Sequence, residues 1–94
     1  MDVTVSGKRV TLRGRLPARA NWDLLTRYGQ GLELQEMAFD DVVDLLRRVI
    51  ESWEFEGDPA EGESYSELDL FGEFMPLVVA VSQQLSAIVS GEKN

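Results

Sequence analysis

Residues 73–90 read EFMPLVVAVSQQLSAIVS, with no charged residue after Glu73. Six apolar side chains recur at the spacing of one helix face: Phe74, Leu77, Val78, Val81, Leu85 and Ile88. Pro76 fits the first turn of this helix, where its missing N–H costs nothing. Further apolar residues, including Val79 and Val89, spread well beyond that face. A helix of this kind is normally buried on more than one side. We therefore expect it to be either the central helix of the core or a helix with one side in an interface with another chain or a partner.

A second amphipathic helix is predicted over residues 39–53. Its apolar side chains form one stripe with the helical spacing: Phe39, Val42, Val43, Leu46, Val49, Ile50 and Trp53. Acidic residues lie in its early turns and arginines in a later turn, which suits the helix dipole. Asp44 is placed to pair with Arg47 or Arg48.

Residues 1–15 predict a β-hairpin, because Val3, Val5, Val10 and Leu12 alternate with polar residues. A type II′ turn at Gly7-Lys8 would pair Val5 with Val10 and Val3 with Leu12. Both pairs would then lie on one face of the hairpin. Since an isolated hairpin is marginally stable in water, this face should pack against the helices or another chain.

Residues 20–29 predict a short helix with Asn21 as its N-cap and Gly29 just beyond its end. Trp22, Leu25 and Tyr28 would face the interior. Residues 30–37 do not favour one state, and the segment is interpreted as a connecting loop or a partial helical turn.

Residues 54–65 predict an exposed acidic loop, entered by a short strand at residues 53–55. A capping box of Ser64 with Glu67, or of Ser66 with Asp69, would start a short helix that Gly72 ends. Residues 66–90 are predicted to form the helical C-terminal part of the domain. The predicted fold class is therefore α+β, mainly α: one small domain over residues 1–94, with a β-hairpin followed by three to four helices.

The composition argues against several classes of function. Hydrophobic residues make up 44% of the chain and charged residues 28%, as in ordinary globular proteins. The absence of Cys and His removes thiol nucleophiles, thiolate metal sites and the commonest general base and metal ligand. We therefore predict a protein that is not an enzyme and that uses no cofactor and no metal. Asp58, Glu61, Glu63 and Glu67 do not match the spacing of a calcium loop.

The net charge of −8 is unevenly distributed. Six of the nine basic residues lie in residues 1–27, and no basic residue lies between Arg48 and Lys93. The asymmetry fits two solvated faces of opposite sign, steering of a charged partner, or like chains stacked head to tail. Arg9, Thr11 and Arg13 would share the outer hairpin face, but the acidic net charge makes nucleic acid an unexpected partner.

The location predicted from the sequence is the cytoplasm. Residues 1–4 lack the basic start and apolar run of a secretory signal. Polar residues interrupt the uncharged stretch at Ser82, Gln83, Gln84 and Ser86, so residues 74–91 are expected to make a poor membrane span.

Six segments occur in an order that resembles the tail assembly chaperones of long-tailed bacteriophages. The hairpin residues Val3-Thr4-Val5 and Val10-Thr11-Leu12-Arg13 come first, and a Leu/Val-rich helix leads to Ser52-Trp53-Glu54-Phe55. The acidic turn Glu56-Gly57-Asp58-Pro59 follows, and Leu68-Asp69-Leu70 precedes the closing helix at Pro76-Leu77-Val78-Val79-Ala80-Val81. Residues 29–39 have no counterpart in this pattern.

The resemblance implies a non-enzymatic chaperone that binds the phage tape-measure protein and recruits tail tube protein, in the cytoplasm of the host cell. The apolar closing helix and the element before it also predict a homo-oligomer, with partner contacts at Trp53, Phe55, Val79, Leu85, Ile88 and Val89. In this interpretation Leu85→Asp abolishes self-association or client binding more than it unfolds the monomer. Two alternatives stay open: another phage head or tail structural subunit, and a small acidic inhibitor that mimics nucleic acid and binds a basic partner.

Overall fold

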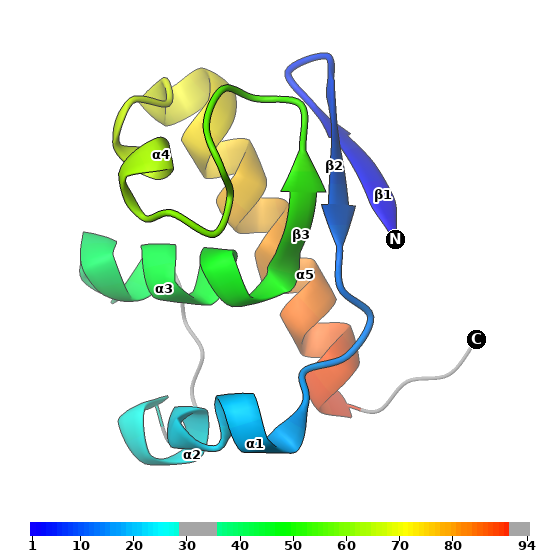
Figure 1. Cartoon of the computed structure of the whole chain (residues 1–94), viewed down its shortest axis with the longest axis vertical. Helices are drawn as coiled ribbons and strands as arrows, with labels where there is room; N and C mark the ends of the chain where they lie inside the picture. The colour runs from blue at the N-terminus through cyan, green and yellow to red at the C-terminus, as the bar shows by residue number, and fades with distance from the viewer. Residues whose placement is uncertain (29–35, 91–94) are drawn as a thin grey trace.

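A computed structural model describes residues 1–28 and 36–90 of the chain. In chain order its elements are β1 (Asp2–Val5), β2 (Lys8–Leu12), α1 (Ala18–Asn21), α2 (Asp23–Tyr28), α3 (Phe39–Val49), β3 (Ile50–Trp53), α4 (Glu63–Ser66), the π-helical turn η2 (Leu70–Phe74) and α5 (Met75–Ser90). The predicted fold class, α+β and mainly α with an N-terminal hairpin, is confirmed (Figure 1).

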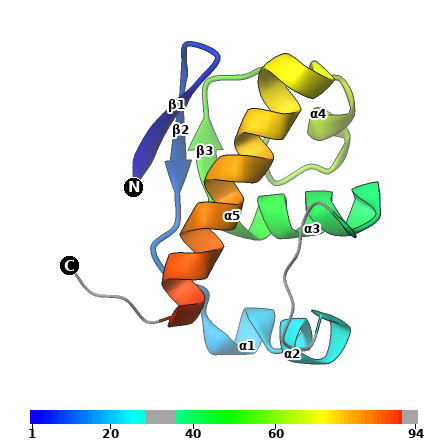
Figure 2. The same ribbon diagram turned by 180° about the vertical axis from the view of Figure 1, so that it is seen from behind.

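The strands form one antiparallel sheet in the order β1-β2-β3. Helix α5 lies across the back of this sheet and also contacts α3, while α1 and α2 lie near its C-terminal end (Figures 1 and 2). The most deeply buried apolar side chains come from these packed elements: Val10, Leu12, Leu45, Leu46, Val49, Ile50, Tyr65, Leu77 and Val81. The core therefore lies between the inner face of the sheet, α3 and α5.

The hairpin forms, but the predicted turn is one residue too late. Its central residues are Ser6 and Gly7, both with positive φ (54° and 80°), as a type I′ turn requires. Val3 therefore lies opposite Val10, and Val5 opposite Lys8. Because odd-numbered residues of β1 still lie opposite even-numbered residues of β2, the prediction that the valines and Leu12 share the core face is confirmed.

The predicted helix over residues 39–53 is too long, because α3 ends at Val49 and β3 begins at the next residue. β3 pairs with β2, with Leu12 opposite Ile50 and Thr11 opposite Ser52. This irregularity leaves Glu51 as an extra residue, a β-bulge, so both Ile50 and Trp53 can turn toward the core. The bulge thus reproduces the i, i+3 spacing of a helix inside a strand.

The N-terminal helical segment differs from its prediction. The structure has two short helices, α1 and α2, where a single helix was predicted. Asn21 is the last residue of α1 and does not cap α2. The side-chain amide of Asn21 donates to the Pro17 carbonyl at 2.8 Å. Trp22, at 67% exposure, and Leu25 face solvent, while Leu24 packs against the core. The predictions for residues 29–35, Gly29 included, lie outside the described residues.

Neither of the two predicted capping serines begins a helix: the short helix α4 follows Gly62, without a side-chain cap, and the C-terminal helical stretch is capped by Asp69. The Asp69 carboxylate accepts the Gly72 N–H at 2.7 Å, and its own N–H donates to Glu73 Oε1 at 2.8 Å. These reciprocal bonds have the form of a capping box. Gly72 therefore does not end a helix, but lies within η2, and Pro76 follows directly in α5. The wider π turn relieves the clash that a proline ring makes inside a regular α-helix.

The helical stretch Leu70–Val89 is long and apolar enough, by length and composition alone, to cross a membrane. The polar residues that argued against a span from the sequence do not prevent this. The core helix of a globular protein can be equally long and apolar. In this protein, 33% of the most apolar stretch of the helix is buried in the interior. The buried side chains, among them Leu77, Val81 and Leu85, belong to the hydrophobic core.

Candidate partner-binding surface

The six predicted partner-binding residues fall into accessible and inaccessible groups. Val79 and Val89 are 46% and 69% exposed, and Trp53 and Ile88 are half-buried. Leu85 is only 2% exposed and Phe55 7%, so these two side chains lie in the core of the single chain and not on its surface. Leu85 lies on the face of α5 that carries Leu77 and Val81, and that face packs into the core.

The outer side of α5 has an unusual chemical character for an exposed helix. No residue from Met75 to Ser90 is charged, although 28% of the whole chain is. Its solvent-exposed positions are occupied by Val79, Gln83, Ser86 and Val89. This side of α5 faces the viewer in Figure 2. An exposed helix normally carries charged residues on its outer face, so this one is suited to contact another protein surface.

Two further exposed apolar residues, which sequence reasoning did not select, lie in the π-helical turn that precedes α5. Phe71 is 80% exposed and Leu70 is also exposed, both within η2. Both residues fit the helical spacing to Phe74, so periodicity alone gave no signal that they lie in solvent. We call Leu70, Phe71, Val79 and Val89 together the η2–α5 surface.

A network of ion pairs holds α2 against α3. Arg48 donates to both carboxylate oxygens of Asp23 (2.8 and 3.0 Å) and to Asp44 (3.1 Å), which confirms the predicted pairing of Asp44 with an arginine. Arg27 donates to Asp44 and Asp41 at 3.1 and 3.3 Å. The hydrogen bond to Arg48 holds the pKa of Asp23 below its ordinary value, and the Asp23 carboxylate raises the pKa of Arg48.

An aromatic cluster supports the acidic loop at residues 54–62. The ring of Trp53 lies 4.9 Å from that of Tyr65 and 5.4 Å from that of Phe55. The indole N–H donates to the Gly57 carbonyl at 2.9 Å, and the Tyr65 hydroxyl donates to the Pro59 carbonyl at 2.7 Å. Burial raises the pKa of Tyr65, so its hydroxyl stays protonated and keeps this bond. Trp53 is thus chiefly a structural residue of the loop.

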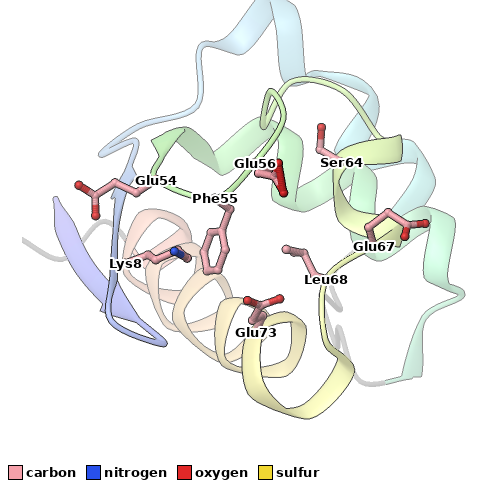
Figure 3. Close-up of a pocket in the computed structure, with 8 residues that line it drawn as sticks. All are labelled: Lys8, Glu54, Phe55, Glu56, Ser64, Glu67, Leu68 and Glu73. Atoms are coloured by element: carbon pink, nitrogen blue, oxygen red, sulfur yellow. The ribbon is translucent and has the colours of Figure 1, made fainter.

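A cavity of about 230 Å³ opens beside this cluster, between the hairpin, the loop and η2. Figure 3 shows Phe55 and Leu68 at its centre, with Lys8 on one side and Glu73 on another. The Lys8 ammonium lies 5.9 Å from the centre of the Phe55 ring. Glu54 and Glu73 already accept main-chain hydrogen bonds, from Arg9 and Asp69. The acidic groups at this opening therefore contribute to holding the local fold.

A second cavity, of about 280 Å³, lies where the end of β2 meets α1 and α3. It is lined by Arg13, Pro17, Ala20, Asn21, Arg47 and Arg48. Arg48 is committed to Asp23 and Asp44, and Arg47 donates to the Ala60 carbonyl at 2.7 Å. The basic character of the N-terminal segment is therefore partly neutralised by contacts within the chain.

Within residues 1–28 and 36–90, no group of three or more His, Cys, Asp or Glu side chains is arranged to hold a metal ion. The accessible features of the described chain thus include the η2–α5 surface, the acidic loop, the outer face of the sheet and the exposed Trp22 and Leu25. Comparison with protein-family models, with curated proteins and with solved structures finds no match to this chain.

Proposed function

We propose that this protein is a non-enzymatic tail assembly chaperone of a long-tailed bacteriophage, which binds the tape-measure protein and recruits tail tube subunits in the host cytoplasm. The observation that carries the proposal is the exposed η2–α5 surface. Leu70, Phe71, Val79 and Val89 place apolar side chains in solvent, and no charged residue interrupts the helix from Met75 to Ser90. The order of segments that resembles these chaperones supplies the identity of the partner.

The chemistry of the surface supports an apolar helical client. An uncharged helix face can pack along a second helix without stranding a buried charge, which would cost several kcal/mol. The loop at residues 54–62 lies on the opposite side of the molecule from the outer face of α5 and carries exposed acidic residues, among them Glu54, Glu56 and Asp58 (Figure 1). A strongly acidic exterior would keep a complex with an apolar client in solution.

Co-expression with the tape-measure protein tests the proposal. We expect the wild-type chain to keep that protein soluble and to co-purify with it. The double variant Phe71→Lys/Val79→Lys should lose this effect, because it would bury two unpaired ammonium groups in the contact. Ser66→Lys is the matched control, since Ser66 is exposed on α4, outside the η2–α5 surface. Each variant is checked for folding by circular dichroism.

Three outcomes would count against this function. If the double variant and the control rescue the tape-measure protein equally, the η2–α5 surface is not the contact. If the chain remains in purified phage particles, it is a structural subunit of the head or tail. If it binds instead to a basic protein in a strongly salt-dependent way, it is an acidic inhibitor that imitates nucleic acid.

A further inference from the structure

The outer edge of β1 is the feature that carries a further inference. Among the residues that the structure describes, β1 pairs with β2 alone, and β2 lies between β1 and β3. In both ribbon views the opposite edge of β1 faces away from the other labelled elements (Figures 1 and 2). A strand edge with free main-chain groups is a template for pairing with another strand.

The hydrogen-bonding pattern identifies which main-chain groups are free. The Met1 amine donates to the Leu12 carbonyl at 3.0 Å, and the Leu12 N–H donates to the Met1 carbonyl at 2.7 Å. Because hydrogen-bonded and non-hydrogen-bonded pairs alternate along an antiparallel ladder, Val3 and Val5 also turn their main-chain groups toward β2. The N–H and C=O groups of Asp2 and Thr4 therefore point to the outer edge.

This edge lacks the features that usually prevent pairing. The strand reads DVTV, with no proline, lysine or bulge, and its β-branched residues favour extended structure. Met1, which precedes it, is exposed despite its apolar side chain. The one charged side chain of the strand, Asp2, accepts a hydrogen bond from the Thr11 hydroxyl at 2.8 Å, on the solvent face of the sheet.

We propose that two copies of this chain pair through their β1 strands, antiparallel about a twofold axis, and form one continuous six-stranded sheet. With the axis at Val3, the valines of the two copies face each other, and Asp2 of each copy lies opposite Thr4 of the other. Each Asp2–Thr4 pair exchanges two main-chain hydrogen bonds. Met1 then lies opposite Val5 of the second copy, so an exposed apolar residue meets the apolar face of the sheet.

The sequence of β1 selects this register over its neighbours. An axis at Asp2 would place the two Asp2 carboxylates directly opposite each other, which is destabilising. An axis at Thr4 would place Asp2 opposite Ser6, whose positive φ of 54° takes it out of the extended conformation. With the axis at Val3, Arg9 of the second copy lies beside that copy's Thr4, two strands from Asp2 on the same face of the sheet, so opposite charges approach across the joint.

The occupant of the edge is a second copy because β1 is complementary to itself in both hydrogen bonds and side chains. The acidic loop is attached to β3, at the far side of the sheet from the joint, so the most acidic parts of the two chains stay apart (Figure 1). The twofold axis places both α5 helices on the same face of the enlarged sheet. This proposal does not rest on the chaperone function, since it concerns a different surface.

Disulfide cross-linking tests the register directly. The chain has no cysteine, so Val3→Cys introduces a single thiol. In the proposed register the two Val3 residues form a non-hydrogen-bonded pair, with Cα atoms about 4.5 Å apart, within the range that a disulfide spans. We expect mild oxidation to convert most of this variant to a covalent dimer. Ser66→Cys, on exposed α4, is the matched control and should stay largely uncross-linked.

Sedimentation of the purified chain provides a second test. The wild type should sediment as a dimer at high concentration. Thr4→Pro removes an outward N–H from each copy while leaving the bonds between β1 and β2, and should raise the dimer dissociation constant at least about tenfold. Thr4→Val keeps the N–H and a β-branched side chain, and should leave that constant nearly unchanged.

Several results would overturn the proposal. One is a wild-type chain that remains monomeric at high concentration, and another is a Val3→Cys variant that cross-links no better than Ser66→Cys. A dimer that persists unchanged in a folded Thr4→Pro variant would place the contact elsewhere. A Val3→Cys thiol that cross-links only to co-expressed tape-measure protein would assign the edge to that partner. If Thr4→Pro does not fold, the comparison of Val3→Cys with Ser66→Cys still tests whether two copies pair through β1.

Discussion

Leu85 and Val79 lie six positions apart on α5 and have opposite surroundings. Leu85 is fully packed in the core, whereas Val79 is close to half exposed. We expect Leu85→Ala to lower the free energy of unfolding by about 2–5 kcal/mol, because it leaves a cavity among packed side chains. Val79→Ala should change it by less than about 0.5 kcal/mol. Urea denaturation of the two variants measures this difference.

Equal effects of these two substitutions would contradict the burial of α5 described above. The same burial changes the expectation for Leu85→Asp. That substitution would place an unpaired carboxylate in the core, so it should unfold the monomer and cannot report on partner binding by itself. The η2–α5 surface must instead be probed at Phe71 and Val79, whose side chains reach solvent.

Asp23 should make the stability of the protein depend on acidity. Its pKa in the folded state is held below the ordinary value of 3.8, mainly by the hydrogen bond to Arg48. Stability from this interaction is therefore present above about pH 4 and is lost as the pH falls through the lowered folded-state pKa. Thermal unfolding of wild type and Asp23→Asn should differ at pH 7, and the difference should shrink as the pH falls below about 4. A constant difference across this range would contradict the assignment.

Sequence reasoning predicted only the local part of this network. Asp44 and Arg48 are four residues apart on one helix, so their pairing follows from helical spacing. Asp23 and Arg48 are separated by twenty-five residues and meet only because α2 packs beside α3. Similarly, Leu85 shared the apolar stripe of α5 with core residues, but periodicity alone cannot say which edge of that stripe remains in solvent.

Gly57 fixes the turn that leads from β3 into the acidic loop. It has a positive φ of 86°, and a Cβ atom there would lie 2.5 Å from Ser64 Oγ. Gly57→Ala should therefore lower the free energy of unfolding by at least about 1–2 kcal/mol, since the left-handed conformation alone costs that much for other residues. Gly14→Ala is the matched control, because its Cβ would meet no atom within 4 Å. Similar melting temperatures for the two variants would contradict this role.

Helices and strands with a regular repeat of apolar residues were predicted well. Segments in which one kind of secondary structure passes directly into another were not. The hairpin and α5 follow from simple alternation and helical spacing, respectively. The C-terminal end of α3 was misplaced because Ile50 and Trp53 keep a helical spacing while lying in a bulged strand. The start of the last helix was misplaced because a π turn carries the chain through Gly72 and Pro76, two residues that ordinarily mark helix ends.

Across the whole molecule, stability should be unevenly distributed. β2 is the central strand and α5 packs on both the sheet and α3, whereas no residue of α1 is buried. We therefore expect amide hydrogen exchange to be slowest in β2 and in the buried turns of α5, and fastest in α1 and α2. Mass spectrometry of exchanged peptides measures the order. Equal protection of the amides of all helices would contradict this order. It would show that the ion pairs of Arg48 stabilise α2 as much as core packing stabilises α5.

The direct passage from α3 into β3 restricts how the length of this chain can change in evolution. Val49 ends the helix and Ile50 begins the strand, so no spacer residue exists between them. One inserted or deleted residue at this joint would rotate Ile50 and Trp53 away from the interior and break their register with β2. Descendants of this sequence should therefore gain and lose residues in the exposed loop after Trp53, and keep the count constant from Phe39 to that tryptophan.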